Sequence, residues 1–386
     1  MKKIVIIGAG EFQNPLIKKA KEMGYETHVF AWECGDIGEK TADCFYPVSI
    51  IEKEQILEQC KKISPAAVVT IASDLAAVTV NYVAGALGLP CNSAECTLCA
   101  TNKFRMREAF FRAGVSTPSF ALIEDADKLE ALQKLQFPLI IKPTDRSGSR
   151  GITKVERLSE AREAAYAAIE YSFEKKAIAE EMILGAEYSC ECISQNGKHH
   201  ILSFTKKETT GEPHFIETGH IEPSDILPEN EQAIKDDIIS ALSALHITTG
   251  ASHAEFRLSD AGKARIIEIG ARMGGDCIGS HLVPLATGYD FMKMVVEAAA
   301  GEPLSMERAP HCDAAAIRFL FTKSDVENMK TVKKRFPGVI VEKSPIKEEN
   351  LLNVVDSSTR AGFYIMAGAR EEIYQVMRLT GAERQE

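Results

Sequence analysis

The stretch that most constrains this chain is a predicted β-hairpin. Residues 252–258 alternate like a half-buried strand, residues 259–263 are rich in turn formers, and residues 264–269 are apolar and β-branched. If the hairpin closes at the middle of this turn, Glu255 and Glu268 face each other across the two strands. Two facing carboxylates in an apolar frame make a site for a hard cation such as Mg²⁺, which is often shared with phosphates.

An arginine follows the hairpin at the mouth of a double-glycine turn. Arg272 lies four residues after Glu268 and just before Gly274 and Gly275. A guanidinium in this position could hold a carboxylate or a phosphate through two parallel hydrogen bonds. The alternative is a surface hairpin with two solvated glutamates, and this stretch alone leaves both interpretations open.

Composition limits the classes of protein that this chain can be. Its 386 residues are 45% hydrophobic, which is enough for two or three domains with cores of their own. A formal net charge of −10 argues against a nucleic-acid partner. No apolar run reaches transmembrane length, and the start of the chain has the pattern of a strand and not of a signal peptide. We therefore expect a cytoplasmic protein without a membrane partner.

The cysteines predict reduced thiols. The ten cysteines have no framework spacing, and the one CxxC, Cys96 to Cys99, lacks a second pair to complete a zinc site. We interpret that pair as structural.

The first hundred residues alternate strands and helices. Strands are predicted at 4–7, 27–31 and 68–71, and helices at 12–23, 53–63 and 81–87. This order indicates a small doubly wound parallel sheet. Its first turn, Gly8-Ala9-Gly10, is an incomplete dinucleotide fingerprint, because Gln13 replaces the third glycine and only Glu33 lies near the end of the second strand. A nicotinamide enzyme is therefore a poor candidate, although the turn could still face a substrate.

A second unit begins near residue 98 and contains a predicted phosphate cradle. A helix opens at Asn102 and runs to Ala113, a short helix follows at 129–135, and a strand at 139–143 carries Lys142. The Gly/Ser loop 147–151 then leads into another strand at 152–155. Backbone N–H groups of such a loop, the hydroxyls of its two serines and the lysine would face phosphate oxygens. The alternative is a glycine-rich hairpin without a ligand.

Two adjacent acids then lie on an apolar strand. Glu180 and Glu181 belong to the predicted strand 177–183, which follows a helix at 159–170, and Glu187 follows just beyond a Leu-Gly break. Adjacent acids usually mark an exposed edge, but between apolar residues they indicate the polar wall of a pocket.

The order of these motifs resembles that of the ATP-grasp superfamily. The residues that carry the resemblance are Lys103, Lys142, the loop 147–151, Glu180-Glu181-Met182-Ile183, Glu187, Glu255, Glu268 and Arg272. The resemblance covers nearly the whole chain. It implies an α/β protein with a doubly wound parallel-sheet domain at 1–97, an ATP-grasp domain at 98–302 with a lid at about 118–182, and a C-terminal α+β subdomain at 303–386.

The resemblance also implies the roles of individual residues toward ATP. Phosphate contacts would come from Lys103, Lys142, Ser147, Gly148 and Ser149, adenine contacts from Glu180, Glu181, Met182 and the backbone of Ile183, and the ribose contact from Glu187. Glu255 and Glu268 would bind Mg²⁺, with Mn²⁺ as a possible substitute. Gly270 stands where the family usually has Asn, so one side-chain metal ligand is missing. Water or the phosphates would have to replace it.

The motif from Glu268 to Arg272 and the segment 215–220 resemble the corresponding segments of the branch that contains the L-amino-acid ligases. This implies substrate contacts by Glu217, His220, Arg272 and Gly274. It also implies joining of a carboxylate to an amine through an acyl phosphate, with Arg272 holding the carboxylate and the later oxyanion. His220 would be a general base or a hydrogen bond to substrate, and Ser149 is a third catalytic candidate. His253 would support the metal site without binding the metal.

Two other functions stay open at this point. A carbamoyl-phosphate or carboxylase type of enzyme would use bicarbonate as the acid. A non-catalytic ATP-binding sensor or assembly subunit would form no bond, and the glycine at position 270 motivates that hypothesis. The expected partners are a small carboxylate and a small amine, and the expected assembly is a homodimer. The pattern of residues does not identify the acid or the amine.

Overall fold

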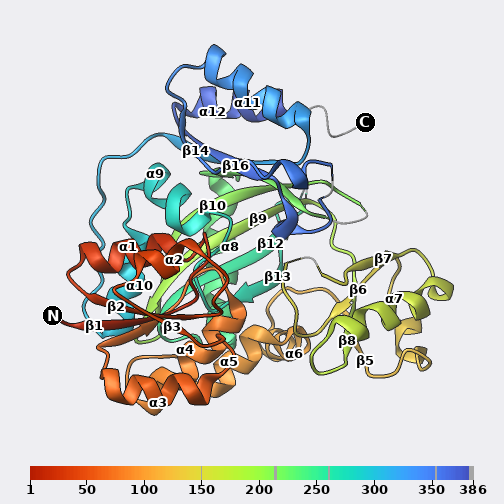
Figure 1. The fold of residues 1–386 in the computed structure, drawn as a ribbon. Coiled ribbons are helices and arrows are strands. Elements are labelled where there is room, and N and C mark those ends of the chain that lie inside the picture. Colours follow the sequence, from red (N-terminus) through yellow and green to blue (C-terminus); the bar gives the residue numbers. More distant parts are fainter. Residues whose placement is uncertain (149, 213–214, 260, 353, 382–386) are drawn as a thin grey trace.

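Three sheets organise the molecule. The computed structural model describes residues 1–148, 150–212, 215–259, 261–352 and 354–381. The sheets have four, eight and four strands, and Figure 1 shows the N-terminal sheet at the lower left and the strands β5–β8 at the lower right, apart from each other. Among the described residues, no helix is both long and apolar enough to cross a membrane. All ten cysteines are free thiols, as their spacing predicts.

The N-terminal sheet is parallel, as predicted. Its strand order is β3-β2-β1-β4, with β1 (Lys3–Ile7), β2 (Glu26–Ala31), β3 (Cys44–Pro47) and β4 (Ala67–Val69). Its helices are α1 (Asn14–Glu22), α2 (Ile37–Thr41), α3 (Lys53–Ile63) and α4 (Asp74–Ala86). The edge strand β3 is absent from the sequence-based prediction, because its four residues are only partly covered and show no apolar alternation.

Helix α4 begins seven residues before its predicted start at 81. Ser73 is its N-cap, and the Ser73 hydroxyl accepts a hydrogen bond from the Ala76 N–H at 3.2 Å. This cap places Asp74 in the first turn of the helix, at the carboxyl end of the parallel sheet.

The second four-stranded sheet, here called the lid sheet, has the order β5-β8-β6-β7 and is antiparallel. Its strands are β5 (Phe120–Ile123), β6 (Leu139–Pro143), β7 (Thr153–Val155) and β8 (Ala177–Glu181), covered by α7 (Leu158–Tyr171). The predicted short helix at 129–135 is instead a 3₁₀ helix, η1 (Glu130–Lys134). Five residues are enough for such a tight turn but short for an α-helix.

Helices α5 (Ala94–Thr101) and α6 (Lys103–Ala113) connect the N-terminal sheet to the lid sheet. The Asn102 side chain accepts a hydrogen bond from the Arg105 N–H at 3.0 Å and caps α6. Gly114, at φ +70°, ends it. These caps confirm the predicted bounds of the helix, and they fix Lys103 in its first turn.

The central sheet has the order β13-β12-β9-β10-β11-β14-β16-β15. Its strands are β9 (Ala186–Gln195), β10 (Lys198–Thr209), β11 (Glu217–Glu222), β12 (Gly250–Leu258), β13 (Ala264–Gly270), β14 (Ala314–Leu320), β15 (Ile340–Lys343) and β16 (Gly362–Gly368). The predicted hairpin is confirmed as β12–β13, and Glu255 is paired with Glu268 in its register. The hairpin therefore forms one edge of the sheet.

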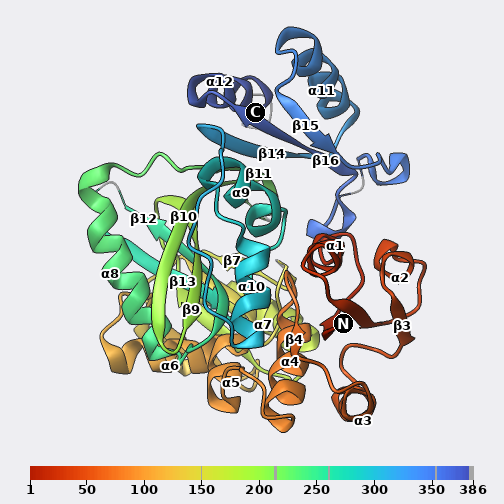
Figure 2. The ribbon, with the colours of Figure 1, turned by 90° about the vertical axis from the view of Figure 1, so that its left-hand side faces the viewer.

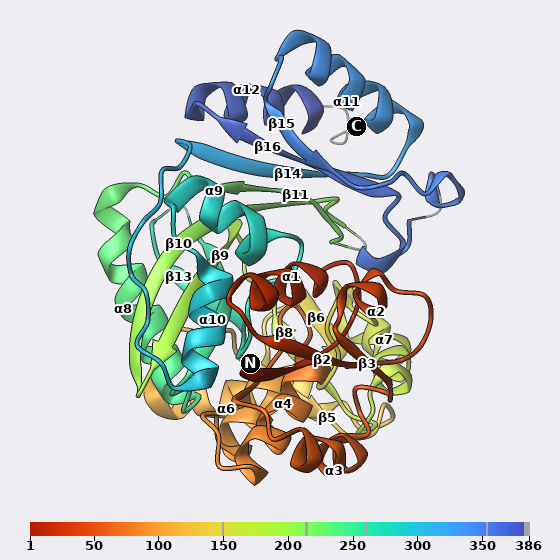
Figure 3. The same ribbon diagram turned by 60° about the vertical axis from the view of Figure 1, so that its left-hand side comes forward.

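Helices cover both faces of this sheet. Figure 2 shows α8 (Pro228–Ala244) along one face and α10 (Phe291–Ala300) along the other, and each contributes buried apolar residues to a separate core. Figure 3 shows α11 (Lys323–Arg335) and α12 (Arg370–Gly381) above the C-terminal strands. The remaining helices are η2 (Ile278–Leu282), α9 (Val283–Thr287), η3 (Glu348–Asn350) and η4 (Ser357–Thr359).

Candidate active site

One cavity between the lid sheet and the β12–β13 hairpin brings together most of the predicted site residues. Its lining includes Lys103, Lys142, Ser147, Gly148, Glu180, Glu181, Met182, Ile183, Glu187, Glu217, Glu255, Glu268 and Arg272. Ser149 lies outside the described residues. His220 and Gly274 do not line this cavity. The roles of all these residues stay predictions, but residues far apart in the sequence share one space.

On the lid side, two cations meet one buried carboxylate. Lys142 Nζ lies 2.7 Å from Glu180 Oε2, and Arg107 Nε lies 2.8 Å from Glu180 Oε1. Burial lowers the pKa of Lys142. Burial also works to raise the pKa of Glu180, but Arg107 and Lys142 outweigh it, so the pKa lies below its ordinary value. Arg107 is missing from the predicted site, although a charge between the apolar Met106 and Phe110 on a helix was a usable signal.

Glu180 and Glu181, which are adjacent on β8, contact different neighbours, because successive side chains of a strand point to opposite faces. The Glu181 carboxylate accepts hydrogen bonds from the Gln136 N–H and the Ser119 hydroxyl, both at 2.9 Å. The Met182 N–H donates to the Pro138 carbonyl at 3.0 Å. These contacts tie the end of β8 to the chain that enters the lid sheet.

An arginine on the hairpin holds the next two predicted residues. Arg257 donates from Nη1 to the Ile183 carbonyl at 2.9 Å and from Nη2 to the Glu187 carboxylate at 3.0 Å. The segment that follows β8 is therefore anchored to β12. This anchor places the predicted adenine and ribose contacts beside the hairpin.

The facing carboxylates of the hairpin each have a lysine partner. Glu268 accepts a hydrogen bond from Lys103 Nζ at 2.8 Å. Lys207, on β10, lies 2.7 Å from Glu255, 3.2 Å from Glu187 and 3.8 Å from Glu217. Burial works to lower the pKa of Lys207, but the three carboxylates raise it well above its ordinary value. Lys207 is absent from the predicted site, because one of two adjacent lysines looks like ordinary surface charge.

His253 links the hairpin to the double-glycine turn. Its Nδ1 is paired with Glu191, and its Nε2 lies 3.1 Å from Glu255. Burial works to lower the pKa of His253, but the two carboxylates raise it to about 9, so the ring is an imidazolium at neutral pH. Glu191 also accepts a hydrogen bond from the Gly274 N–H at 3.0 Å. A Cβ at Gly274 would lie only 2.6 Å from Glu191 Oε1, so this approach requires glycine.

Arg272 is paired with Asp74, in the first turn of α4. Its Nε donates to Asp74 Oδ1 at 2.9 Å, and its Nη2 donates to Asp74 Oδ2 at 3.1 Å. Burial works to raise the pKa of Asp74, but the guanidinium outweighs it and keeps the carboxylate ionised. Asp74 was missed because the predicted helix began at 81, which left Asp74 in an unassigned loop.

His220 lies behind the cavity in a second charged group. It is 1% exposed, and its Nε2 lies 3.4 Å from Asp276 Oδ2. Arg360 pairs with Asp276 and stacks on Phe319 with 3.6 Å from its Cζ to the ring centroid. Burial works to raise the pKa of Asp276, but Arg360 holds it well below its ordinary value. The predicted contact between His220 and a substrate stays a prediction.

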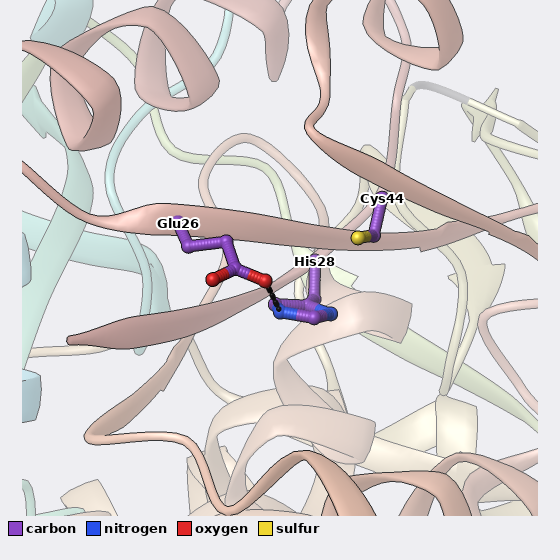
Figure 4. A group of neighbouring side chains, drawn as sticks. All are labelled: Glu26, His28 and Cys44. Carbon is purple, nitrogen blue, oxygen red and sulfur yellow. Dashed lines mark hydrogen bonds and ion pairs between the residues drawn. The ribbon is translucent and has the colours of Figure 1, made fainter. Parts of the chain in front are cut away.

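Hard oxygen donors suit Mg²⁺, and Glu255 and Glu268 supply them on facing strands beside three lysines that could balance phosphate charge. These residues therefore fit the cation that the sequence implies. The described residues contain one group of three metal-ligating types with donor atoms within 4.8 Å of one another: Glu26, His28 and Cys44 (Figure 4). There, His28 already bonds Glu26 through Nε2 and Tyr46 through Nδ1, each at 3.0 Å.

Comparisons with known proteins show what parts of this chain are similar to. A family model described as an ATP-grasp domain matches residues 135–280. The chain is 29% identical over 212 residues to D-alanine–D-alanine ligase B of Chromobacterium violaceum, covering 52% of this chain and 67% of that protein. It is 29% identical over 212 residues to alanine–anticapsin ligase of Bacillus subtilis, covering 49% of this chain and 44% of that protein.

A solved structure matches over almost the full length. The L-amino acid ligase of Bacillus licheniformis superposes with a TM-score of 0.83 at 24% identity, covering 99% of this chain and 98% of that one. The described fold is thus shared from the N-terminal sheet to the C-terminal strands, while the curated relatives match over about half of this chain.

Proposed function

We propose that this chain, in which residues 135–280 match an ATP-grasp domain, is an ATP-dependent ligase that joins a carboxylate to an amine. The observation that carries the proposal is the cavity in which Lys103, Lys142 and Lys207 surround the facing carboxylates Glu255 and Glu268. Such a cavity suits a triphosphate with its cation next to a site of carboxylate activation. The relatives named as ligases of amino acids support this class of reaction.

The nucleotide would lie between the lid sheet and the hairpin. Its phosphates would compete with Glu180 for Lys142 and with Glu268 for Lys103, because a polyanion offers these lysines more negative charge than one carboxylate does. Glu255 and Glu268 would hold Mg²⁺, which neutralises phosphate charge when bound, and the same oxygens also suit Mn²⁺. Lys103 Nζ also donates to the Arg146 carbonyl at 2.8 Å, so the loop 147–151 is tied to the phosphate end.

The chemistry follows from the poor reactivity of a carboxylate. Its oxygen attacks the γ-phosphorus of ATP, the bond to the leaving ADP breaks, and an acyl phosphate forms. The amine then attacks the acyl carbon, phosphate leaves, and the amine loses a proton to give the amide. Arg272 lines the cavity and would stabilise the oxyanion of the second step. The loop 147–151 would keep water from the acyl phosphate.

Phosphate release tests the proposal. Wild-type protein with ATP and Mg²⁺ is incubated with single amino acids, with pairs of amino acids, and with bicarbonate plus one amine. A single amino acid supplies both a carboxylate and an amine, so we expect phosphate together with a dipeptide mass for those single or paired amino acids that are substrates, and neither product with ATP and Mg²⁺ alone. Release with bicarbonate would instead assign the carbamoyl-phosphate type of reaction. ATP binding without release under any condition would contradict the ligase and support a non-catalytic ATP-binding subunit.

A further inference from the structure

The loop that follows β4 is hydrogen-bonded to the turn that carries Arg272. The Ala72 N–H donates to the Met273 carbonyl at 3.1 Å, and Ala72 adopts φ +59°, a left-handed conformation that residues with a side chain rarely take. The side chain of Gln13 donates to the carbonyl of the preceding residue, Ile71, at 3.1 Å. The N-terminal sheet thus presents this loop in one fixed conformation, and the next element is the α4 turn that carries Asp74.

Asp74 uses only one edge of the Arg272 guanidinium. It accepts from Nε and from one hydrogen of Nη2. The other edge, formed by Nη1 and the second hydrogen of Nη2, is left for another acceptor, and none of the described residues takes a hydrogen bond from Nη1. Because Arg272 also lines the cavity, this pairing can orient the guanidinium without occupying the edge that a substrate would need.

Gly270 makes room for the pair. A Cβ at this position would lie 3.0 Å from Arg272 Cζ and 3.1 Å from Asp74 Oδ1. A larger side chain there would have to displace either the guanidinium or the carboxylate. The glycine on β13 and the aspartate on α4 therefore belong to one arrangement, although one ends a strand of the central sheet and the other begins a helix of the N-terminal unit.

We propose that Asp74 is the positioning residue for Arg272, so that the N-terminal sheet completes the site of amide formation. This proposal rests on the ligase function above. Asp74 acts through Arg272 and does not touch the substrate. It also lines a second cavity together with Lys103, Ser147 and Glu268. The orientation of Arg272 is thus set at the point where the N-terminal sheet, the hairpin and the loop 147–151 meet.

A double-mutant cycle tests the proposal. Asp74→Asn keeps the size of the side chain but removes the charge and one acceptor. We expect its kcat to fall about ten- to a hundredfold, as for a misoriented catalytic group, while the KM for the acid and the affinity for ATP stay within about twofold. Arg272→Ala and the double variant should have the same kcat, because Asp74 has nothing left to orient. Losses that multiply in the double variant would overturn the proposal.

Two further variants separate positioning from general damage. Gly270→Ala should reduce kcat by a smaller factor than Asp74→Asn, because the new Cβ only presses on the pair. Glu208→Gln removes the carboxylate that lies 2.6 Å from the buried Arg318. Glu208 follows Lys207 on β10, but successive side chains of a strand point to opposite faces and Glu208 does not line the cavity, so kcat should stay near the wild-type value. An equal loss in Glu208→Gln would mean that breaking any buried ion pair has this effect, which would overturn a specific role for Asp74.

A direct measurement of the pair does not depend on turnover. The ¹⁵N–¹H signal of Arg272 Nε, assigned by its disappearance in Arg272→Lys, should exchange slowly with solvent in the wild type and rapidly in Asp74→Asn. Unchanged slow exchange in Asp74→Asn would overturn the proposal. Slow wild-type exchange combined with no phosphate release for any substrate pair would contradict the proposed function and leave the positioning contact established.

Discussion

Two buried sets of charges adjoin the cavity and differ in how they are matched. In the lid set, Lys142 and Arg107 share the single carboxylate of Glu180. In the turn set, Asp74 and Arg272 form one pair in which both carboxylate oxygens are used. Burial lowers the pKa of Lys142, whereas Asp74 outweighs burial and raises the pKa of Arg272.

The difference teaches how one cavity can both bind a polyanion and hold a reacting centre. A set with an excess of positive charge is stabilised when it binds a phosphate, because the added anion offsets the repulsion between the buried cations. A matched ion pair is not stabilised when a ligand replaces one partner, since the partner that is removed from the pair becomes an uncompensated buried charge. The lid set is therefore suited to binding, and the turn set is suited to fixed geometry.

The largest effect on ligation is expected for the two facing carboxylates of the hairpin, which belong to neither set. Glu255→Gln and Glu268→Gln should each reduce ligation by more than about a hundredfold, because each removes a charged oxygen ligand for the cation on the phosphates. The measurement is phosphate release over a Mg²⁺ titration, with Tm as the control for folding. Activity near the wild-type value in either variant would exclude that carboxylate as a ligand.

Loss of the turn set should affect chemistry and spare ATP binding. Arg272→Ala should lower ligation on the order of a hundredfold, as for removal of one oxyanion donor, with the affinity for ATP within a few-fold. Arg272→Lys should recover little, because an ammonium cannot pair with Asp74 and a substrate as the planar fork does. Calorimetry beside steady-state kinetics measures both quantities, with Arg265→Ala, an exposed arginine on β13, as a control. A parallel collapse of ATP binding would assign Arg272 to the nucleotide.

Loss of the lid set should show the opposite pattern. Lys142→Ala should weaken ATP binding on the order of tenfold, since one charge-assisted contact to phosphate is lost. Lys154→Ala is the matched control, because this lysine also lies in the lid sheet but pairs with Glu156 and Glu212. Isothermal calorimetry with ATP and Mg²⁺ compares the two variants. Equal affinities would show that Lys142 belongs to the fold and not to the nucleotide site.

The smallest effect, on the pH dependence of stability, is expected for Glu222, a buried carboxylate outside both sets. Glu222, on β11, accepts a hydrogen bond from the Thr205 hydroxyl at 2.9 Å, and burial raises its pKa to about 8. Between its ordinary value of 4.5 and about 8, the folded protein keeps a proton that the unfolded chain has lost. Stability should therefore be highest below this window, fall as the pH rises through it, and level off above it.

Glu222→Gln should remove this part of the pH dependence, because the amide stays neutral throughout. The difference in Tm between pH 5 and pH 8 should shrink by a few degrees relative to the wild type, roughly the shift expected for a change of one to two kcal/mol. Identical pH profiles for the two proteins would mean that Glu222 is ionised in the folded state and that an unseen cation compensates it.

Much of the local structure was predictable from residue patterns. The strand at 139–143, the helix between Asn102 and Gly114, and the β12–β13 hairpin follow from apolar periodicity, a capping side chain and turn-forming residues. The facing of Glu255 and Glu268 was also predictable, because register in a hairpin is set by its turn. These features depend on residues that are close together in the sequence.

The sequence by itself determined the order of the motifs and the class of the fold, and it predicted most of the acids and lysines that line the cavity, but not Lys207. The tertiary structure decided which charges pair there: Arg107 with Glu180, Lys207 with three carboxylates, and Arg272 with Asp74. Asp74 and Arg272 are 198 positions apart. No local pattern encodes such a pair, because its energy depends on burial and on distances that exist only after the sheets have packed together.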